Sequence, residues 1–379
     1  MKFLHLGDLH LGKRVHGFSM CSDQKFALEQ IIQMAVTNQV DAVVIAGDIY
    51  DKTIPSGEAV GLFDSFFTKL CSAGVCVLAV SGNHDSGERL NFGTKLLEQS
   101  GFTLVGTFDG TVKTVSLSDE YGEVKFHLLP WIRPMEWKEQ LQLTKCTQQC
   151  AMEQVLKMIP QTDTRQVLVA HTFVTAGGIL PEQSDSEIVP VGGLDAVDAA
   201  LFERFDYTAL GHLHRPQKIG SPNIRYSGSL LKYSFSEARY PKSVPLVEMT
   251  DHVEIQLLPL TPLHEMREIR GRLDDVTSPL VVQSGDCEDY LRVTLTNDEE
   301  LFDAQSALKA VYPNLMQLDF DNTRTRTADS IGMTDETIVQ RLSVEQLFAQ
   351  FFEEQNGKPM TEWQIETIAA LCSRLEESE

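Results

Sequence analysis

Short apolar runs, each followed by a small polar motif, recur along roughly the first two-thirds of the chain. The runs are mostly rich in Val, Leu and Ile, and they cover residues 3–6, 42–46, 75–80, 166–170 and 207–210. Apolar runs of this length are typical of buried strands in a parallel sheet. Because the carboxyl ends of such strands meet at one edge of an open α/β sheet, the motifs behind them are expected to lie together.

The motifs behind these runs carry carboxylate, imidazole and amide side chains. They read Asp8-Leu9-His10, Gly47-Asp48-Ile49-Tyr50-Asp51, Gly82-Asn83-His84-Asp85, Ala170-His171 and Gly211-His212-Leu213-His214. Such ligands, without a cysteine among them, suit Mn, Fe or Zn ions better than a soft thiolate site does. The groups are too many for one ion, whereas two ions that share a carboxylate would use them. Asp48 fits this bridge because it lies centrally in the set.

Two ions roughly 3.5–4 Å apart hold both the attacking water and the oxygens of a phosphoryl group, so phosphoester hydrolysis is the first expectation. Taken alone, each motif has a simpler interpretation. A Gly-Asp pair behind a strand is usually a turn, and a buried histidine such as His171 is more often a hydrogen-bonded core residue than a ligand. The occurrence of five such motifs in order, each behind a strand and each carrying a possible metal ligand, favours the dinuclear site. Five other histidines are expected to be structural or surface residues: His5, His16, His127, His252 and His264.

The ordered set of motifs resembles the calcineurin-type metallophosphoesterase superfamily. Within it, these motifs, together with Val169–Val174 and Arg225–Ser229, resemble the SbcD-type nuclease subunits of bacterial SbcCD DNA-repair complexes. The resemblance is close over the first two-thirds of the chain and holds in outline over the rest. It implies an α/β fold, a two-sheet αββα sandwich, with a small α/β capping domain and a C-terminal helical hairpin.

The resemblance also implies two divalent ions, for which Mn²⁺ is expected, with Asp48 shared between them. The implied ligands are Asp8, His10, Asp48 and His214 for one ion, and Asp48, Asn83, His171 and His212 for the other. His84 would be the general acid that protonates the leaving oxygen, a role worth roughly 10²–10⁴ in rate. Asp85 is expected to orient the imidazole of His84. Asp51 is either a residue that supports a ligand or a turn carboxylate, and the sequence leaves both open.

Net charge at first argues against a nucleic-acid substrate, since the chain carries −22 at neutral pH and phosphate backbones repel acidic surfaces. Residues 211–242 reverse this balance, with six cations against the single Glu237, and with Tyr226, Tyr233, Phe235 and Tyr240 interleaved. This stretch is either a guide for a phosphodiester backbone or an ordinary strand exterior. The expected DNA-contacting residues are Lys13, Arg14, Arg215, Arg225 and Lys232.

The chain is expected to divide into a nuclease domain (1–262), a capping domain (263–322), a linker (323–340) and partner-binding helices (341–379). Residues 266–273, 290–295 and 315–320 alternate like strands, and 301–311 has a helical pattern. In the tail, Ser343 and Thr361 are expected helix caps, each followed by an apolar stripe. These helices either fold back on their own chain or bind a partner. The resemblance supplies one, the coiled-coil root of the ATPase SbcC.

The resemblance therefore implies a metal-dependent DNA exonuclease or endonuclease that acts with SbcC on DNA ends and hairpins in repair, recombination and replication. The resemblance suggests a homodimer, built from helices near 58–72 and 90–100, that forms a heterotetramer with SbcC. The alternatives are a stand-alone phosphatase or cyclic-nucleotide phosphodiesterase, and a scaffold on an inactive phosphoesterase fold. Phosphatases of the superfamily usually carry Arg and Glu where this chain has Lys52 and Asp85. No segment reaches about 18 uninterrupted apolar residues, and seven cysteines without a Cys-x-x-Cys pair fit a reducing compartment, so no membrane association and a cytoplasmic location are expected.

Overall fold

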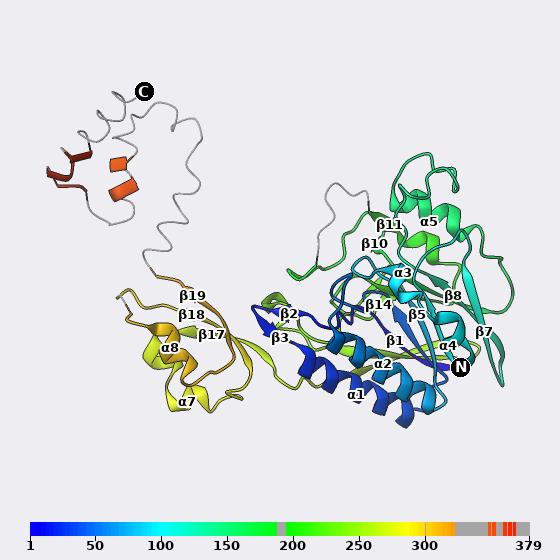
Figure 1. Cartoon of the computed structure of the whole chain (residues 1–379), viewed down its shortest axis with the longest axis horizontal. Helices are drawn as coiled ribbons and strands as arrows, with labels where there is room; N and C mark the ends of the chain where they lie inside the picture. Colours follow the sequence, from blue (N-terminus) through cyan, green and yellow to red (C-terminus); the bar gives the residue numbers. More distant parts are fainter. Residues whose placement is uncertain are drawn as a thin grey trace. The chain divides into compact units, whose positions relative to one another are not determined.

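The computed structural model describes residues 1–187, 195–299 and 301–322, and short stretches at 348–349, 351–353, 359–361, 363–365 and 367–368. The chain divides into two compact units, Met1–Met266 and Arg267–Glu379. The first unit is drawn in blue to yellow-green in Figure 1 and carries every site residue expected from the sequence. The predicted linker at 323–340 and the cap at Ser343 lie outside the described residues.

Two six-stranded sheets form the frame of the first unit. One sheet has the order β16 (Val253–Pro259), β15 (Ser243–Met249), β1 (Lys2–Leu6), β4 (Ala42–Ala46), β5 (Cys76–Val80) and β6 (Phe102–Val105). The other has the order β13 (Gln217–Ile219), β14 (Ser221–Tyr226), β12 (Tyr207–Gly211), β9 (Arg165–His171), β8 (Gly122–Leu129) and β7 (Lys113–Asp119). In the first sheet β1, β4, β5 and β6 run parallel, as do β14, β12, β9 and β8 in the second.

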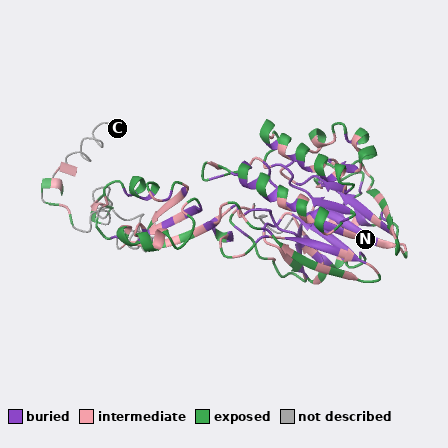
Figure 2. Ribbon diagram, turned by 90° about the horizontal axis from the view of Figure 1, so that it is seen from below, coloured by how far each residue is buried: buried purple, intermediate pink, exposed green. Residues whose placement is uncertain are grey.

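The two sheets pack face to face through one shared apolar core. Alternate residues of each strand point into it, such as Val167 and Val169 of β9 and Tyr207 of β12. The ring of Phe3 lies 5.4 Å from that of Phe126 and 5.6 Å from that of Tyr207. Figure 2 shows these strands as the buried centre of the unit.

Helices form the outer layers of the sandwich. The other face of β9 packs through Leu168 and Ala170 against a cluster that includes Met152 and Val155 of α5 (Gln148–Leu156). Helices α1 (Cys21–Thr37) and α2 (Gly57–Ser72) lie against each other, and α2 packs on β5 (Figure 1). The layer order is helix, sheet, sheet, helix, which confirms the predicted αββα sandwich.

One predicted helix, near Leu90–Ser100, is broken into short pieces. The structure has α3 (Gly87–Leu90), α4 (Thr94–Leu97) and the 3-10 turn η1 (Glu98–Ser100) instead. Gly93 lies between the first two pieces with a φ of 76°, and this left-handed conformation interrupts the helical hydrogen bonds. Further short elements of the unit are β2 (Arg14–Val15), β3 (Phe18–Ser19), β10 (Phe173–Thr175), β11 (Ala196–Asp198), η3 (Ala199–Phe202) and η4 (Phe235–Glu237).

The second unit has its own three-stranded sheet and its own core. The sheet order is β17 (Met266–Gly271), β18 (Tyr290–Leu295) and β19 (Leu315–Phe320), with α6 (Leu273–Val276), α7 (Pro279–Val282) and α8 (Ala304–Lys309) between the strands. Leu291, Val293 and Leu295 of β18 pack with Leu308 and Tyr312. The helix expected over 301–311 is shorter because Asp303 caps it by accepting from the amide of Ser306.

In the tail, the Gln364 half of the capping pattern expected at Thr361 is present. The Gln364 side chain accepts from the Thr361 amide at 2.9 Å, and the Ile365 amide donates to the Thr361 carbonyl at 3.0 Å. The remainder of the predicted hairpin falls largely on residues outside the described set. Among the helices that the structure does describe, none has the length and apolarity that a membrane span requires.

Candidate metal centre

The five motifs converge because the strands before them end at one level. Leu6 pairs with Ile45, Ala46 pairs with Val80, and in the second sheet Gly211 pairs with His171. A hydrogen bond then joins the two sheets at this edge, since Nδ1 of His171 donates to the carbonyl of Ala46 at 2.9 Å. The prediction that strand ends gather these side chains is confirmed by this register.

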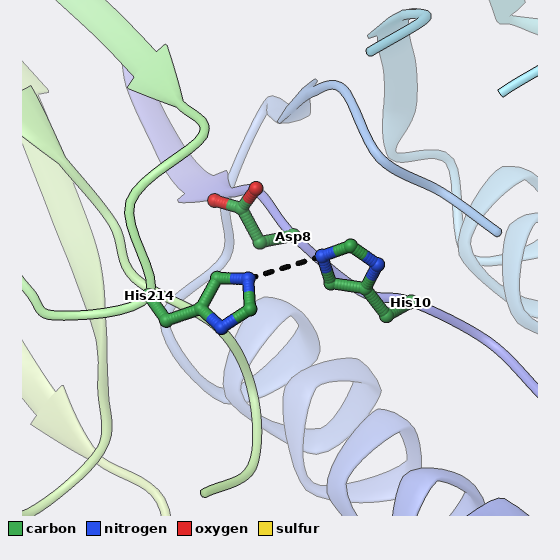
Figure 3. Close-up of side chains that lie close together, drawn as sticks. All are labelled: Asp8, His10 and His214. Atoms are coloured by element: carbon green, nitrogen blue, oxygen red, sulfur yellow. Dashed lines mark hydrogen bonds between the residues drawn. The ribbon is translucent and has the colours of Figure 1, made fainter. Parts of the chain in front are cut away.

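The side chains of the motifs form a tight, buried cluster. Three groups of nitrogen and oxygen atoms lie within 4.8 Å of one another: Asp8, His10 and His214; His10, Asp48 and His84; and Asp8, Asp48 and His171. Figure 3 shows the first group, in which Nε2 of His10 lies 3.1 Å from Nε2 of His214. Asp48 belongs to two of the groups, as a central carboxylate should.

Asn83 and His212 complete the cluster on its other side. Nε2 of His171 lies 2.9 Å from Oδ1 of Asn83 and 3.4 Å from Oδ2 of Asp48. Nδ1 of His212 lies 3.2 Å from the same Asn83 oxygen. All seven predicted metal ligands are therefore brought together by five strand ends.

Four of the seven predicted ligands hold an uncommon backbone conformation. Asp8, His10, Asp48 and His212 have φ values of 52°, 44°, 49° and 118°. Positive φ is unfavourable for residues with a side chain, and such residues concentrate at functional sites where the surrounding fold holds them. Here the hydrogen bonds of the Asp8 and His10 amides to the carbonyls of Gly47 and Asp48 hold the turns in place.

The glycine before Asp48 is required by space as well as by conformation. Gly47 has a φ of 87°, and a Cβ there would lie 2.4 Å from Nδ1 of His171. Gly82 is similarly constrained, because its Cβ would lie 2.1 Å from Oδ1 of Asp48. The glycines of these motifs therefore allow ligands from different strands to approach one another.

The nitrogen lone pairs of the cluster fit bound cations. The Ala46 carbonyl can only accept, so His171 carries a hydrogen on Nδ1 and directs Nε2 toward Asp48 and Asn83. The Nε2 atoms of His10 and His214 lie 3.1 Å apart. Two nitrogen lone pairs would repel each other at this distance unless a proton or a cation lay between them. Oxygen and imidazole donors arranged in this way suit divalent ions such as Mn²⁺ or Zn²⁺.

Burial governs the protonation of the cluster. Burial, and then the charge of His171, lowers the pKa of His212 to about 3, and burial raises the pKa of Asp8 to about 6. Burial by itself would lower the pKa of His171. Favourable interactions, chiefly the charge and the hydrogen bond of the neighbouring Asp48 carboxylate, outweigh this effect and raise the pKa to about 9. His171 must therefore lose a proton before its Nε2 can bind a cation.

The ring of His84 is held by a backbone group and not by Asp85. Its Nδ1 donates to the carbonyl of Asp51 at 3.1 Å, and its amide donates to Oδ1 of Asp48 at 2.9 Å. Asp85 was expected to contact this ring, but its carboxylate bonds to backbone amides instead. The Asp85 carboxylate accepts from the amides of Ile49, Tyr50 and Gly82 at 3.1, 2.9 and 2.9 Å, so it ties together the loops that carry Asp48 and Asn83.

Asp51 contacts two residues of the centre by its side chain. Its Oδ1 accepts from Nζ of Lys13 at 2.7 Å and lies 3.6 Å from Nδ1 of His10. Lys13, expected to contact DNA, thus has its charge paired beside the cluster. Of the two possibilities left open for Asp51, these contacts favour a supporting role over that of a simple turn residue.

Two residues that sequence reasoning missed hold the His10 loop from behind. Nε2 of Gln24, on α1, donates to the carbonyl of His10 at 2.7 Å, and its Oε1 accepts from the amide of Gly12 at 3.0 Å. The hydroxyl of Tyr233 donates to the carbonyl of Leu9 at 2.7 Å. Gln24 is not distinguished in sequence because it lies in an amphipathic helix. Tyr233 stands out only as an aromatic residue of the basic stretch, and nothing in the sequence indicates its contact with Leu9.

Most of the cations expected to contact DNA have acidic partners. Beside Lys13, Arg215 pairs with Glu182, and Nζ of Lys232 lies 2.6 Å from a carboxylate oxygen of Glu265. The two remaining cations donate to backbone carbonyls, that of Pro222 for Arg225 and that of Gly17 for Arg14. Arg225 is half-buried, whereas Arg14 is exposed. Arg14 is therefore the expected contact that is best placed to meet a phosphate.

Three of the four aromatic side chains between these cations are not available for stacking on bases, and the fourth, Tyr240, is half-buried with the Arg215 guanidinium 4.8 Å from its ring centroid. Tyr226, Tyr233 and Phe235 are buried, at 0, 3 and 5% exposure. Lys242 is buried too, and its ammonium group lies 2.6 Å from a carboxylate oxygen of Glu237. Residues 211–242 therefore do not form one continuous basic, aromatic stretch of surface. Three of their cations are paired with acidic residues, and two of those acids lie outside this stretch of sequence.

Two cavities adjoin the cluster. One, of about 170 Å³, lies beside Asn83 and is lined by Trp131, Trp137 and Arg133 among others. The Trp131 ring stacks on that of His212, with 6.1 Å between centroids and 15° between planes. The other, of about 340 Å³, lies beside Asp51 and includes Arg14 and Lys52 in its lining.

Known proteins resemble this chain over nearly its whole length. Residues 1–216 match the model of the calcineurin-like phosphoesterase family, and residues 262–356 match a model described as the type 5 capsule protein repressor C-terminal domain. Two curated relatives are named as the D subunit of the nuclease SbcCD. The protein from Staphylococcus saprophyticus is 31% identical over 99% of this chain and 98% of its own, and that from Staphylococcus epidermidis is 31% identical over 98% of both.

Two solved structures resemble the chain more distantly. TT1561 of Thermus thermophilus is 14% identical, with a TM-score of 0.39 over 68% of this chain and 98% of that one. A dimetal phosphatase from Danio rerio is 13% identical, with a TM-score of 0.41 over 69% of this chain and 98% of that one.

Proposed function

The chain belongs to the SbcD group of the calcineurin-like phosphoesterase family, and we propose that it is a metal-dependent DNA nuclease that works with an SbcC-type ATPase. The observation that carries this proposal is the buried cluster of seven ligand side chains at the strand ends. Phosphodiester hydrolysis by two ions is the chemistry that such a donor set serves.

We assign Asp8, His10, Asp48 and His214 to one ion, and Asp48, Asn83, His171 and His212 to the other. The shared position of Asp48 supports this division, because its carboxylate lies among ligands of both sets. Mn²⁺ is the proposed metal for both positions. Two ions bound there would neutralise charge on the phosphoryl oxygens and lower the pKa of an attacking water.

His84 is the proposed general acid. The Asp51 carbonyl fixes a hydrogen on Nδ1, so the proton that can be transferred must sit on Nε2. Its amide is anchored to Asp48, which keeps the imidazole next to the ion positions. The residue is half-buried rather than fully enclosed, so its ring can reach the leaving oxygen of a bound substrate.

The two cavities suggest where a DNA strand lies. Arg14 and Lys52, at the cavity beside Asp51, are exposed cations suited to the phosphate backbone. Trp131, at the cavity beside Asn83, offers an aromatic face suited to a nucleobase. We propose that the strand crosses the ions between these two cavities, with Arg14 and Lys52 as its principal cationic contacts.

The tail is the proposed site of ATPase binding. Among its described residues, the large apolar side chains of Phe351, Trp363 and Ile365 are exposed at 56, 73 and 52%. An amphipathic helix with such a stripe binds a groove or a coiled coil. Removing residues 338–379 should therefore abolish co-elution with SbcC while leaving Mn²⁺-dependent hydrolysis of a small diester unchanged.

A homodimer is the proposed form of the nuclease, as part of a heterotetramer with SbcC. Beside α2 lies a cavity of about 310 Å³ lined by apolar residues such as Phe63 and Phe67. Ile54 and Phe92, also in its lining, are exposed at 70 and 90%, and Leu96, close to Phe92 in sequence, at 77%. An exposed apolar surface of this kind is typical of an interface between subunits.

The deciding experiment is a metal-replacement nuclease assay on the full chain. Metal-free protein is supplied with Mn²⁺, Mg²⁺ or Zn²⁺ and tested on duplex, hairpin and single-stranded DNA, with a nitrophenyl diester as the generic substrate. Mn²⁺-dependent cleavage of DNA, accelerated on duplex ends by SbcC and ATP, is expected. Hydrolysis of the diester without any cleavage of DNA would show a phosphodiesterase of another specificity instead.

A further inference from the structure

A buried ion pair lies behind His214, and the chemistry proposed above does not use it. Oε2 of Glu237 accepts from Nζ of Lys242 at 2.6 Å, and the two side chains are exposed by only 0 and 4%. Removing two charges from water costs about as much as their attraction returns, so such a pair adds little to stability. The further hydrogen bonds that the Glu237 carboxylate accepts point instead to a role in positioning its neighbours.

The carboxylate is connected to His214 through one hydroxyl group. The Ser186 hydroxyl donates to Oε1 of Glu237 at 2.6 Å, and the same Oγ lies 2.6 Å from Nδ1 of His214. A hydroxyl has a single hydrogen, and an ionised carboxylate can only accept. The hydrogen of Ser186 therefore points to Glu237, and Oγ must accept from a hydrogen on Nδ1 of His214. This leaves Nε2 as the nitrogen that can bind a cation, where it faces His10.

The backbone of His214 is held by the same group of residues. Its amide donates to Oε1 of Glu187 at 2.6 Å, and its carbonyl accepts from Nζ of Lys242 at 2.7 Å. Ring, amide and carbonyl are thus all held by side chains from sequence-distant segments. Ordinary packing would fix the place of this residue but would not select which ring nitrogen carries the hydrogen.

We propose that Ser186 is a positioning residue which, supported by the Glu237–Lys242 pair, fixes the Nδ1–H tautomer of His214 and thereby sets the affinity of one of the two ion positions. The inference rests on the proposed role of His214 as a metal ligand. Hydrogen bonds to the far side of a ligating histidine commonly change metal affinity by about 10- to 100-fold.

The test compares three variants of the full chain. Ser186→Ala removes the acceptor, and Ser186→Thr keeps it. Ser234→Ala is the matched control, since Oγ of Ser234 also donates to Oε1 of Glu237, at 3.2 Å, while the ring of His214 is bonded to Ser186 instead. The measurements are calorimetric titration with Mn²⁺, ring ¹⁵N spectra of the histidines in metal-free protein, and the unfolding temperature.

We expect Ser186→Ala to weaken one Mn²⁺ site by about 10- to 100-fold, to leave the other unchanged, and to lose the single Nδ1–H form of His214. Ser186→Thr should restore both properties, and Ser234→Ala should retain them. Wild-type affinity at both sites in Ser186→Ala would overturn the inference, as would an equal weakening of both sites with a lower unfolding temperature. Failure of the wild-type chain to bind Mn²⁺ at all would instead overturn the proposed function.

Discussion

His171 and His214 are assigned to different ions, and they are oriented in different ways. The ring N–H of His171 goes to a backbone carbonyl at the end of β4, whereas that of His214 goes to a serine side chain backed by a buried ion pair. A carbonyl is supplied by any residue at position 46, so the first arrangement follows from strand packing alone. The second depends on particular side chains at distant positions. One half of the centre is thus set by the fold, and the other by a few individual residues.

Asp48 is assigned to both ions, so its replacement should have the largest effect on metal binding and activity. Asp48→Asn retains an oxygen that can accept from the His84 amide, but a neutral amide cannot balance two divalent charges. Both ions should bind weakly, and nuclease activity should vanish. Metal content per chain after gel filtration measures this, with Asp251→Asn, an exposed carboxylate, as control. Two tightly bound ions in an active variant would show that Asp48 is not the bridge.

His84→Gln should separate ion binding from chemistry in both halves. The ions should remain, because His84 is assigned to neither, while cleavage of DNA falls by about 10²-fold or more for want of a proton donor. A nitrophenyl diester, whose leaving group needs no proton, should be affected less. The exposed His252→Gln serves as control. Equal losses on the two substrates would exclude the general-acid role.

Gly47→Ala should weaken binding at the ion position of His171, which is set by strand packing. The new methyl group would lie 2.4 Å from Nδ1 of His171, at a position with a φ of 87°. Gly17→Ala is a close control, because Gly17 has a φ of 88° and nothing within 4 Å of the added Cβ. Both variants carry the conformational cost of about 1 kcal/mol, and Gly47→Ala should in addition weaken the His171 ion. Identical metal affinities in the two variants would contradict the close approach.

The sequence is sufficient to predict the five strands that precede the motifs, the order of these motifs and the seven clustered ligands. These features are local: a buried strand shows as an apolar run, and the residue behind it is placed by the sheet edge. Asp85 is a case in which the neighbours in sequence indicate the wrong contact. Its neighbour in sequence is His84, but its carboxylate turns to three backbone amides, because buried N–H groups of two loops require an acceptor.

The supporting residues could not be predicted, since their partners are far away in sequence. Ser186, in a polar loop, and Gln24, in a helix, have no local mark of burial against a ligand. Glu237 is the nearest to a signal, as the single acid among six cations. The charges around it illustrate the same limit. Arg215 and Lys232 belong to a basic stretch of sequence, but Glu182 and Glu265 neutralise them in the folded chain.

Tyr233→Phe should have the smallest effect, and it tests whether the His10 side tolerates the loss of one support. The variant removes a hydroxyl that donates to the Leu9 carbonyl at 2.7 Å and accepts from Gln24 at 3.0 Å. Gln24 still lies 3.4 Å from that carbonyl and 2.7 Å from the carbonyl of His10, so the loop keeps its principal contact.

We expect this substitution to lower the free energy of unfolding by about 0.5–1.5 kcal/mol. The control is Tyr207→Phe, which removes a buried hydroxyl bonded to His5 between the sheets, away from the ligand loops. Denaturant titration should show similar losses for both variants, and calorimetry should show a slightly weaker Mn²⁺ site in Tyr233→Phe alone. An effect on Mn²⁺ affinity as large as that of Ser186→Ala would mean that the His10 loop depends on individual side chains as strongly as His214 does. Both histidine ligands of this ion would then be held by particular side chains, in contrast to the backbone contact that holds His171.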